Sequence, residues 1–182
     1  MDFFCLLNKG LIKLIKILKI SCIFLVFLSI NFSNALETQA QDTSIVIAQL
    51  ASQYQINPQL IYSMISVESS FNINAVSHCD ARGIMQVTRP TWDWITQEYL
   101  EVNWDFDEDC FDLEKNITVG IRFLKWISDY LDNHSAELND TKLNLMAACY
   151  NAGPGAIQKY NFQIPPYEET QNYVKKINDF LQ

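Results

Sequence analysis

The sequence has little of what nucleic-acid-binding and zinc-binding proteins use. Its 182 residues include 13 Lys and Arg against 21 Asp and Glu, a formal net charge of −8. Phosphate backbones and anionic lipid surfaces repel an acidic chain, so neither is expected as a partner. The two histidines, His78 and His134, are isolated, and no Cys/His cluster has zinc-ligand spacing. No metal or cofactor is therefore expected.

The sequence also lacks strand-like alternation of useful length and any internal repeat. Apolar residues recur at helical spacing instead, and 49% of the residues are hydrophobic, which is enough for a sizeable core. A chain of this length is by default one domain. These features predict an all-α domain of helices packed around a central one. Helices are expected at residues 43–54, 58–71, 90–99, 116–132, 143–151, 154–159 and 167–181, with irregular chain at 72–88.

Residues 1–35 have the pattern of a secretory signal peptide. Four lysines precede an uninterrupted apolar run of eleven residues, and small residues follow at Ser33 and Ala35. This pattern predicts export, with cleavage after Ala35. The run is shorter than the about 20 residues of a membrane span, so an uncleaved anchor is the weaker alternative. The rest of the chain divides into a polar lead-in, residues 36–44, and one domain, residues 45–182.

Three cysteines remain once the signal peptide, with Cys5 and Cys22, is removed. An odd number in an exported protein suggests one disulfide and one free thiol. Cys79 and Cys110 both lie in polar, loop-like sequence, and we expect them to pair. Cys149 lies in an apolar helical run, where it is expected to be a small buried hydrophobic residue.

Glu68 is the carboxylate whose position is most unusual. Asn57 is a candidate N-cap before a helix in which Ile61, Met64 and Ile65 mark the buried face. Glu68 falls on that same face, near the C-terminal end of the helix. Burial and the negative end of the helix dipole both raise the pKa of a carboxyl group. The pattern indicates a carboxyl kept protonated to act as an acid, or alternatively a buried glutamate satisfied by a cation or by backbone donors.

The segment at residues 103–114 is acidic and aromatic. Its aspartates Asp105, Asp107 and Asp109 resemble the start of a calcium loop. An EF-hand loop has Gly at its sixth position and Glu at its twelfth, where this chain has Cys110 and Asn116. The segment is therefore predicted to be an acidic loop that leads into a helix.

Two further stretches combine glycine or other small residues with a polar side chain. In Gly83-Ile-Met-Gln86, the glycine allows the backbone to pass close to a ligand, and the amide offers donors and an acceptor to hydroxyl and acetamido groups. In the stretch from Ala147 to Gly155, small residues allow tight helix packing, and Tyr150 supplies a phenol hydroxyl.

Four motifs follow one another along the chain. They are Glu68-Ser-Ser-Phe-Asn72, Gly83-Ile-Met-Gln86, Tyr150-Asn-Ala-Gly-Pro-Gly155 and Glu169-Thr-Gln-Asn-Tyr-Val174. In this order, over about residues 45–180, the sequence resembles the soluble lytic transglycosylases with a goose-type lysozyme-like domain. The resemblance implies a compact, all-α lysozyme-like domain with a central catalytic helix and little or no sheet.

The resemblance also implies a role for individual residues. Glu68 takes the place of the catalytic acid and base. The residues implied to contact the substrate or to line the cleft are Ser77, Met85, Gln86, Tyr150, Asn151, Glu169 and Tyr173. The chain departs from the family after Gln86, where Thr88 and Arg89 stand in place of methionine and proline.

The implied activity is cleavage of the β-1,4 bond between N-acetylmuramic acid and N-acetylglucosamine in peptidoglycan, with formation of 1,6-anhydromuramic ends. A lysozyme-like hydrolase would instead need a second carboxylate, for which Asp80 is the candidate. A non-catalytic wall-binding assembly protein would keep the groove without the reaction. The expected setting is the periplasm, as a monomer, in wall turnover or beside a secretion, conjugation or pilus apparatus.

Overall fold

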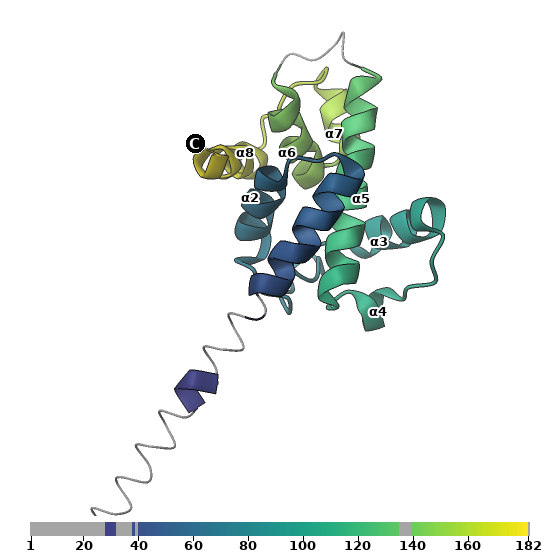
Figure 1. The fold of residues 1–182 in the computed structure, drawn as a ribbon. Helices are drawn as coiled ribbons and strands as arrows, with labels where there is room; N and C mark the ends of the chain where they lie inside the picture. Colours follow the sequence, from purple (N-terminus) through teal and green to yellow (C-terminus); the bar gives the residue numbers. More distant parts are fainter. Residues whose placement is uncertain (1–27, 32–37, 39, 135–139, 182) are drawn as a thin grey trace, which may run out of the picture. The chain divides into compact units, whose positions relative to one another are not determined.

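The computed structural model describes residues 28–31, 38, 40–134 and 140–181 (Figure 1). The chain divides into two units, residues 1–42 and residues 43–182. In the first unit, residues 28–31 are helical, and most of the predicted signal peptide lies outside the described residues. Among the described residues, no helix has both the length and the apolar character needed to cross a membrane.

The second unit is helical throughout its regular structure, as predicted. Residues 40–54 are helical, so the helix predicted at residues 43–54 is present and begins at or before residue 40. The following elements are α2 (Pro58–Ser69), α3 (Arg89–Ile95), the π-helix η1 (Thr96–Leu100), α4 (Phe106–Asp109), α5 (Leu113–Asp132), α6 (Lys142–Ala152), α7 (Pro154–Lys159) and α8 (Glu168–Leu181). Between α2 and α3 the described chain forms only two isolated β-bridges, which join Val76 to Arg82 and Arg82 to Val87.

Local capping explains where these helices begin. The Asn57 side chain accepts a hydrogen bond from the Gln59 amide at 2.9 Å, and a proline occupies the first turn of α2. Helix α5 begins three residues before the predicted start because Asp112 accepts a hydrogen bond from the Lys115 amide. The acidic segment holds the short helix α4, which the sequence did not indicate, because Asp105 caps it.

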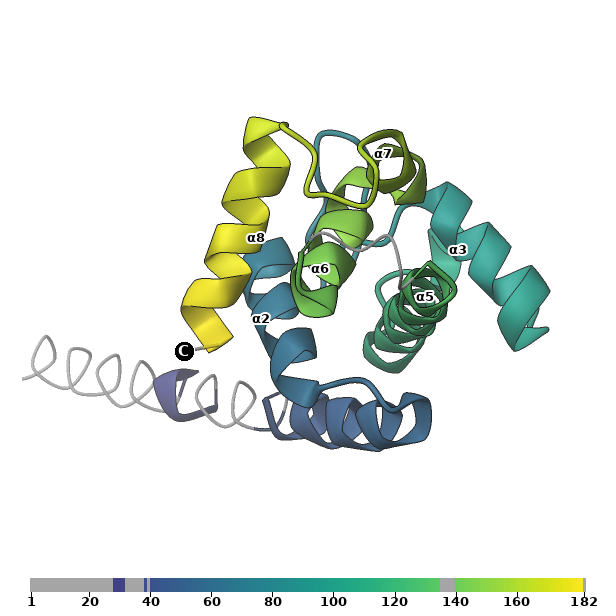
Figure 2. The same ribbon diagram turned by 90° about the horizontal axis from the view of Figure 1, so that it is seen from above.

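Helix α6 lies at the centre of this unit. In Figure 2 it is flanked by α8 on one side and by α5 on the other, and it packs against both. Its residues 145–149 are all buried. Helix α8 also packs against α2, and α5 packs against α3. The arrangement brings the C-terminal end of α2, the irregular segment after it, α6 and α8 together around Glu68.

Candidate active site

Glu68 lies in the last turn of α2, where the sequence placed it. Its neighbours Ile61, Met64 and Ile65 are all fully buried. Burial raises the pKa of the Glu68 carboxyl from 4.5 to about 7, against the lowering effect of a hydrogen bond from Tyr173 and with a further rise from the charge of Glu169. At neutral pH the group is therefore divided between its acid and its carboxylate, as a residue that both donates and accepts a proton requires.

Two tyrosines from different helices surround this carboxyl group. The Tyr173 hydroxyl of α8 donates to Glu68 Oε1 at 2.7 Å. The Tyr150 hydroxyl of α6 donates to the Met85 carbonyl oxygen at 2.8 Å. Burial and the charge of Glu68 raise the pKa of both phenols well above 10, so both stay protonated. In the described part of the chain, the two side chains that act on the Glu68 pKa are thus a neutral hydrogen-bond donor, Tyr173, and an acid, Glu169.

The turn at residues 83–86 reaches the site through its backbone. The Ser69 hydroxyl, next to Glu68, donates to the Ile84 carbonyl oxygen at 2.7 Å. Met85 is fully buried, and a Cβ added to Gly120 of α5 would lie 2.5 Å from its sulfur atom. The Met85 side chain thus packs against α5, while its carbonyl oxygen holds the Tyr150 hydroxyl.

Two predicted substrate-binding residues bind the protein's own backbone. Gln86 uses its amide group to donate to the Ala75 and Gly83 carbonyl oxygens, at 3.1 and 2.9 Å, which leaves its side-chain oxygen for a ligand. The Ser77 hydroxyl oxygen accepts from the Cys79 and Ala81 amides at 3.2 and 3.0 Å. Both residues therefore shape the irregular segment as well as lie in it.

The remaining predicted site residues lie where α6 meets α8. The Asn151 side-chain oxygen accepts a hydrogen bond from Thr170 at 2.8 Å, which ties the end of α6 to the first turn of α8. Glu169 is exposed beside Thr170, and its charge acts on Glu68. These contacts hold Tyr173, one helical turn further on, at the carboxyl group.

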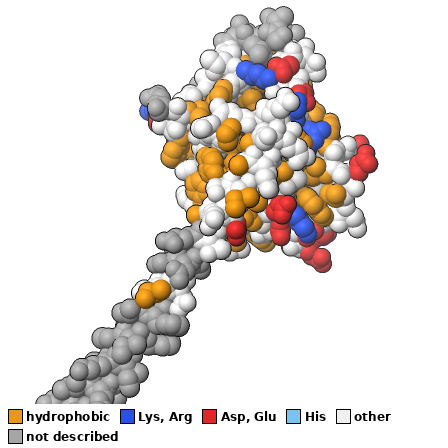
Figure 3. All heavy atoms as spheres, viewed as in Figure 1, with side chains coloured by type: hydrophobic (Ala, Val, Ile, Leu, Met, Phe, Trp, Pro, Cys, Tyr) orange, Lys and Arg blue, Asp and Glu red, His pale blue; other side chains and the backbone are white. Residues whose placement is uncertain are grey.

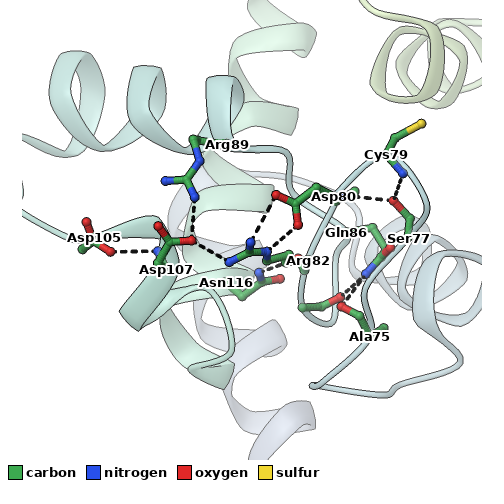
Figure 4. A network of polar contacts seen from close by, with 12 residues as sticks. Ala75, Ser77, Cys79, Asp80, Arg82, Gln86, Arg89, Asp105, Asp107 and Asn116 are labelled. Atoms are coloured by element: carbon green, nitrogen blue, oxygen red, sulfur yellow. Dashed lines mark hydrogen bonds and ion pairs between the residues drawn. The ribbon is translucent and has the colours of Figure 1, made fainter.

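Asp80 belongs to a separate network of ion pairs (Figure 4). Its carboxylate makes a bidentate contact with Arg82, at 2.7 and 3.1 Å. Arg82 also contacts Asp107 at 2.8 Å, and Arg89 contacts the same aspartate at 2.5 Å. We call Asp80, Arg82, Arg89 and Asp107 the ion-pair cluster. In Figure 3 acidic and basic side chains gather on the surface around α4, at the lower right of the unit.

The disulfide predicted between Cys79 and Cys110 is not formed. Both cysteines are free, because Cys79 lies exposed on the loop while Cys110 is fully buried at the end of α4. Cys149 is buried as predicted, and burial raises the pKa of its thiol to about 12.

Asn116 is the residue near the site that the sequence did not reveal. It appeared there only as the wrong residue for a calcium loop, yet it is 1% exposed and accepts a hydrogen bond from the Met85 amide at 2.9 Å. A polar residue directly before Ile117, in the buried stripe of α5, is the signal that could have identified it.

In the described part of the chain, no three His, Cys, Asp or Glu residues are grouped to hold a metal ion.

Comparisons with known proteins agree with these observations. The family model described as Transglycosylase SLT domain matches residues 45–172. A membrane-bound lytic murein transglycosylase C from Histophilus somni (strain 2336) is 29% identical over 171 residues, which cover 80% of this chain and 47% of that protein. Another from Actinobacillus pleuropneumoniae serotype 5b is 32% identical over 129 residues, which cover 68% of this chain and 34% of that protein. The chain thus spans less than half the length of these relatives.

Solved structures show the same fold. The 70 kDa soluble lytic transglycosylase SLT70 from Escherichia coli has a TM-score of 0.63 at 21% identity, over 75% of this chain and 23% of that one. An inactive mutant of the lytic transglycosylase Slt from Pseudomonas aeruginosa gives the same TM-score and coverage at 18% identity. With most of its length matched by the family model, this chain belongs to the Transglycosylase SLT domain family.

Proposed function

We propose that this protein is a peptidoglycan lytic transglycosylase that cleaves the β-1,4 bond between N-acetylmuramic acid and N-acetylglucosamine. The observation that carries the proposal is the Glu68 carboxyl, which accepts a hydrogen bond from the protonated Tyr173 and has a pKa raised by burial to about 7. The relatives named above are lytic murein transglycosylases, and one of the similar structures is a mutant described as inactive. This reaction needs one carboxyl group whose pKa lies near neutral pH, so that it can donate a proton and then take one up.

The first step uses Glu68 as an acid. Its carboxyl donates a proton to the oxygen that links the two sugars, and the bond from that oxygen to muramic acid C1 breaks. The acetamido oxygen of the same muramic acid bonds to C1 and shields the developing cation, as in other substrate-assisted glycosidases. The raised pKa keeps a large fraction of Glu68 protonated for this step at neutral pH.

The second step uses the same group as a base. The Glu68 carboxylate takes the proton of the muramic acid C6 hydroxyl, whose oxygen attacks C1 and displaces the acetamido oxygen. A 1,6-anhydro ring closes, and Glu68 is again protonated. The Tyr173 hydroxyl, 2.7 Å from Oε1, stabilises the carboxylate that exists between the two steps. The cycle consumes no water.

A hydrolase that uses Asp80 is the alternative from the same substrate class. That role would require the Asp80 carboxylate to orient a water molecule, but the carboxylate is bound by both ends to Arg82. The carboxylate that a lysozyme-like hydrolase would use as its second acid is therefore already paired with Arg82. The geometry favours the transglycosylase.

The products of digestion test the proposal. Purified sacculi treated with the protein are expected to release muropeptides that end in 1,6-anhydromuramic acid, identified by mass spectrometry. Muropeptides that carry only reducing-end muramic acid would instead identify a hydrolase. A preparation that binds sacculi and releases neither product would identify a non-catalytic wall-binding protein.

We further propose that the protein is exported to the periplasm, where peptidoglycan is accessible, as a monomer. The basic and apolar pattern of residues 1–35 supports export, and the membrane-bound names of the relatives fit an envelope location. N-terminal sequencing of the exported protein should find the residue after Ala35 if the signal is cleaved. Its compact catalytic unit fits an enzyme that opens gaps for a secretion, conjugation or pilus apparatus, which pull-down from crosslinked envelopes would test.

A further inference from the structure

Asn116 connects three separate segments next to the active site. It lies in the first turns of α5, and its side-chain oxygen accepts a hydrogen bond from the Met85 amide at 2.9 Å. Its side-chain nitrogen donates to the Arg82 carbonyl oxygen at 3.0 Å and to the Cys110 carbonyl oxygen at 2.8 Å. Figure 4 shows Asn116 just below Arg82. Both polar atoms of this buried side chain are used on backbone groups.

The fit around this amide is close. A Cβ added to Gly83 would lie 2.2 Å from the Asn116 nitrogen and 2.4 Å from the Cys110 carbonyl oxygen. Gly83 also has a φ of +78°, which favours glycine. The turn at residues 83–86 therefore lies directly against Asn116. Loss of the amide would remove the Asn116 partner of the Met85 N–H and of the Cys110 carbonyl group, whereas the Arg82 carbonyl oxygen would keep its hydrogen bond from the Val87 amide.

The backbone that Asn116 holds is the backbone that reaches Glu68. Within the same turn, the Ile84 carbonyl oxygen accepts from Ser69, which is adjacent to Glu68, at 2.7 Å. The Met85 carbonyl oxygen accepts from Tyr150 at 2.8 Å. Asn116 thus fixes the amide of the residue whose carbonyl oxygen holds the Tyr150 hydroxyl.

We propose that Asn116 is a positioning residue for the reaction: it fixes the Met85 backbone so that Tyr150 is held beside Glu68 and not bonded to it. This inference rests on the proposed function. When the turn relaxes, the Tyr150 hydroxyl loses this acceptor and becomes able to turn to the Glu68 carboxylate, whose charge already acts on it. A second phenol donor on that carboxylate makes Glu68 a weaker base and lowers its pKa.

Steady-state kinetics on soluble glycan strands test this role. Asn116→Ala is expected to lower kcat by about 10- to 100-fold, the effect of small misplacement near a reacting group, and to change KM little. The alkaline limb of its pH profile should move to lower pH. The matched control is Leu131→Ala, which creates a cavity on the same helix, α5, at a fully buried position in its last turn. Leu131→Ala should lower stability and leave kcat and the pH profile of the folded enzyme unchanged.

A double-mutant cycle tests whether Asn116 acts through Tyr150. In a Tyr150→Phe background, Asn116→Ala should reduce kcat by only a small part of its effect in the wild type. Multiplication of the two single effects would overturn the proposal. So would a kcat loss in Asn116→Ala that simply follows the folded fraction, as seen in circular dichroism. If Asn116→Ala does not fold, Asn116→Ser, which leaves room for a bridging water, takes its place in the same cycle.

The same assay separates this inference from the proposed function. If the wild type releases no anhydromuropeptides, the proposed function fails. If the wild type releases them and Asn116→Ala does so at the same rate per folded molecule and with the same pH profile, only the positioning role fails.

Discussion

The segment at residues 82–89 takes part in two polar regions, and they are built in opposite ways. Around Glu68, reached by the middle of the segment, one half-buried carboxyl lies beside neutral phenols and backbone groups. In the ion-pair cluster, the arginines that begin and end the segment lie against exposed carboxylates at Asp80 and Asp107. Water screens charges in the second region and is largely excluded from the first.

The difference explains why only one of the two regions has a perturbed acid suited to catalysis. Burial raises the pKa of Glu68, and among the described residues the effect that opposes it is the hydrogen bond from the neutral Tyr173. Hydrogen bonds from Arg89 and Arg82 lower the pKa of Asp107. An acid that must lose and regain a proton at neutral pH needs the first environment, whereas a permanently ionised surface acid needs the second.

The largest expected effect comes from removal of the Glu68 carboxyl group. Glu68→Gln should lower the release of anhydromuropeptides by about 10³-fold or more, because general acid and general base catalysis are lost together. Chromatography of digested sacculi measures the rate. The matched change in the ion-pair cluster, Asp80→Asn, should leave most of the activity. An equal loss in both variants would contradict the assignment of Glu68 as the single catalytic carboxyl.

Glu68→Gln should raise the stability of the protein although it lowers its activity. Between pH 4.5 and 7 the folded protein keeps the Glu68 proton that the unfolded chain has lost, so the free energy of unfolding falls as pH rises through this range. The loss amounts to at most about 3 kcal/mol and is complete above pH 7. Urea denaturation should therefore show Glu68→Gln to be more stable than the wild type at pH 8, by more than at pH 4.5. A constant difference across this range would show that the Glu68 pKa is not raised.

Two substitutions around Glu68 should move its pKa in opposite directions. Tyr173→Phe removes the hydrogen bond that lowers the pKa, so the alkaline limb of the activity profile should move to higher pH. Glu169→Gln removes a charge that raises the pKa, so the limb should move to lower pH. The pH dependence of kcat measures both. If the alkaline limb moved in the same direction in both variants, this electrostatic description of the site would be excluded.

The smallest effect is expected in the ion-pair cluster. Asp107→Asn removes the negative charge that Arg82 and Arg89 share, but exposed ion pairs contribute little to stability. The change in Tm should stay below about 4 °C, and kcat should remain close to that of the wild type. Thermal denaturation and the kinetic assay measure these values. A kcat loss comparable to that of Asn116→Ala would show that the cluster, too, positions the turn.

The sequence predicted the helices and the position of Glu68 near the end of α2 well, because both depend on local patterns. Spacing along α2 placed Glu68 on the buried face, and the Asn57 cap fixed the start of that helix. Asn116 was missed because two of its three partners, Met85 and Arg82, lie 31 and 34 residues away in the chain, and no local pattern reveals them. The disulfide prediction was wrong because the loop composition around Cys110 does not reveal that the thiol faces the core. The short helix α4 was missed because four residues give no periodicity.

The hydrogen bond from Tyr173 to Glu68 joins residues that are 105 positions apart. Helix α8 is the last of the described helices to be synthesised, so Tyr173 and Glu169 reach Glu68 only after every other described helix has been made. Both residues act on the pKa of Glu68, which therefore has its final value only once α8 has packed against α2. In the proposed reaction, the acid thus reaches its working pKa only when the helical unit is assembled.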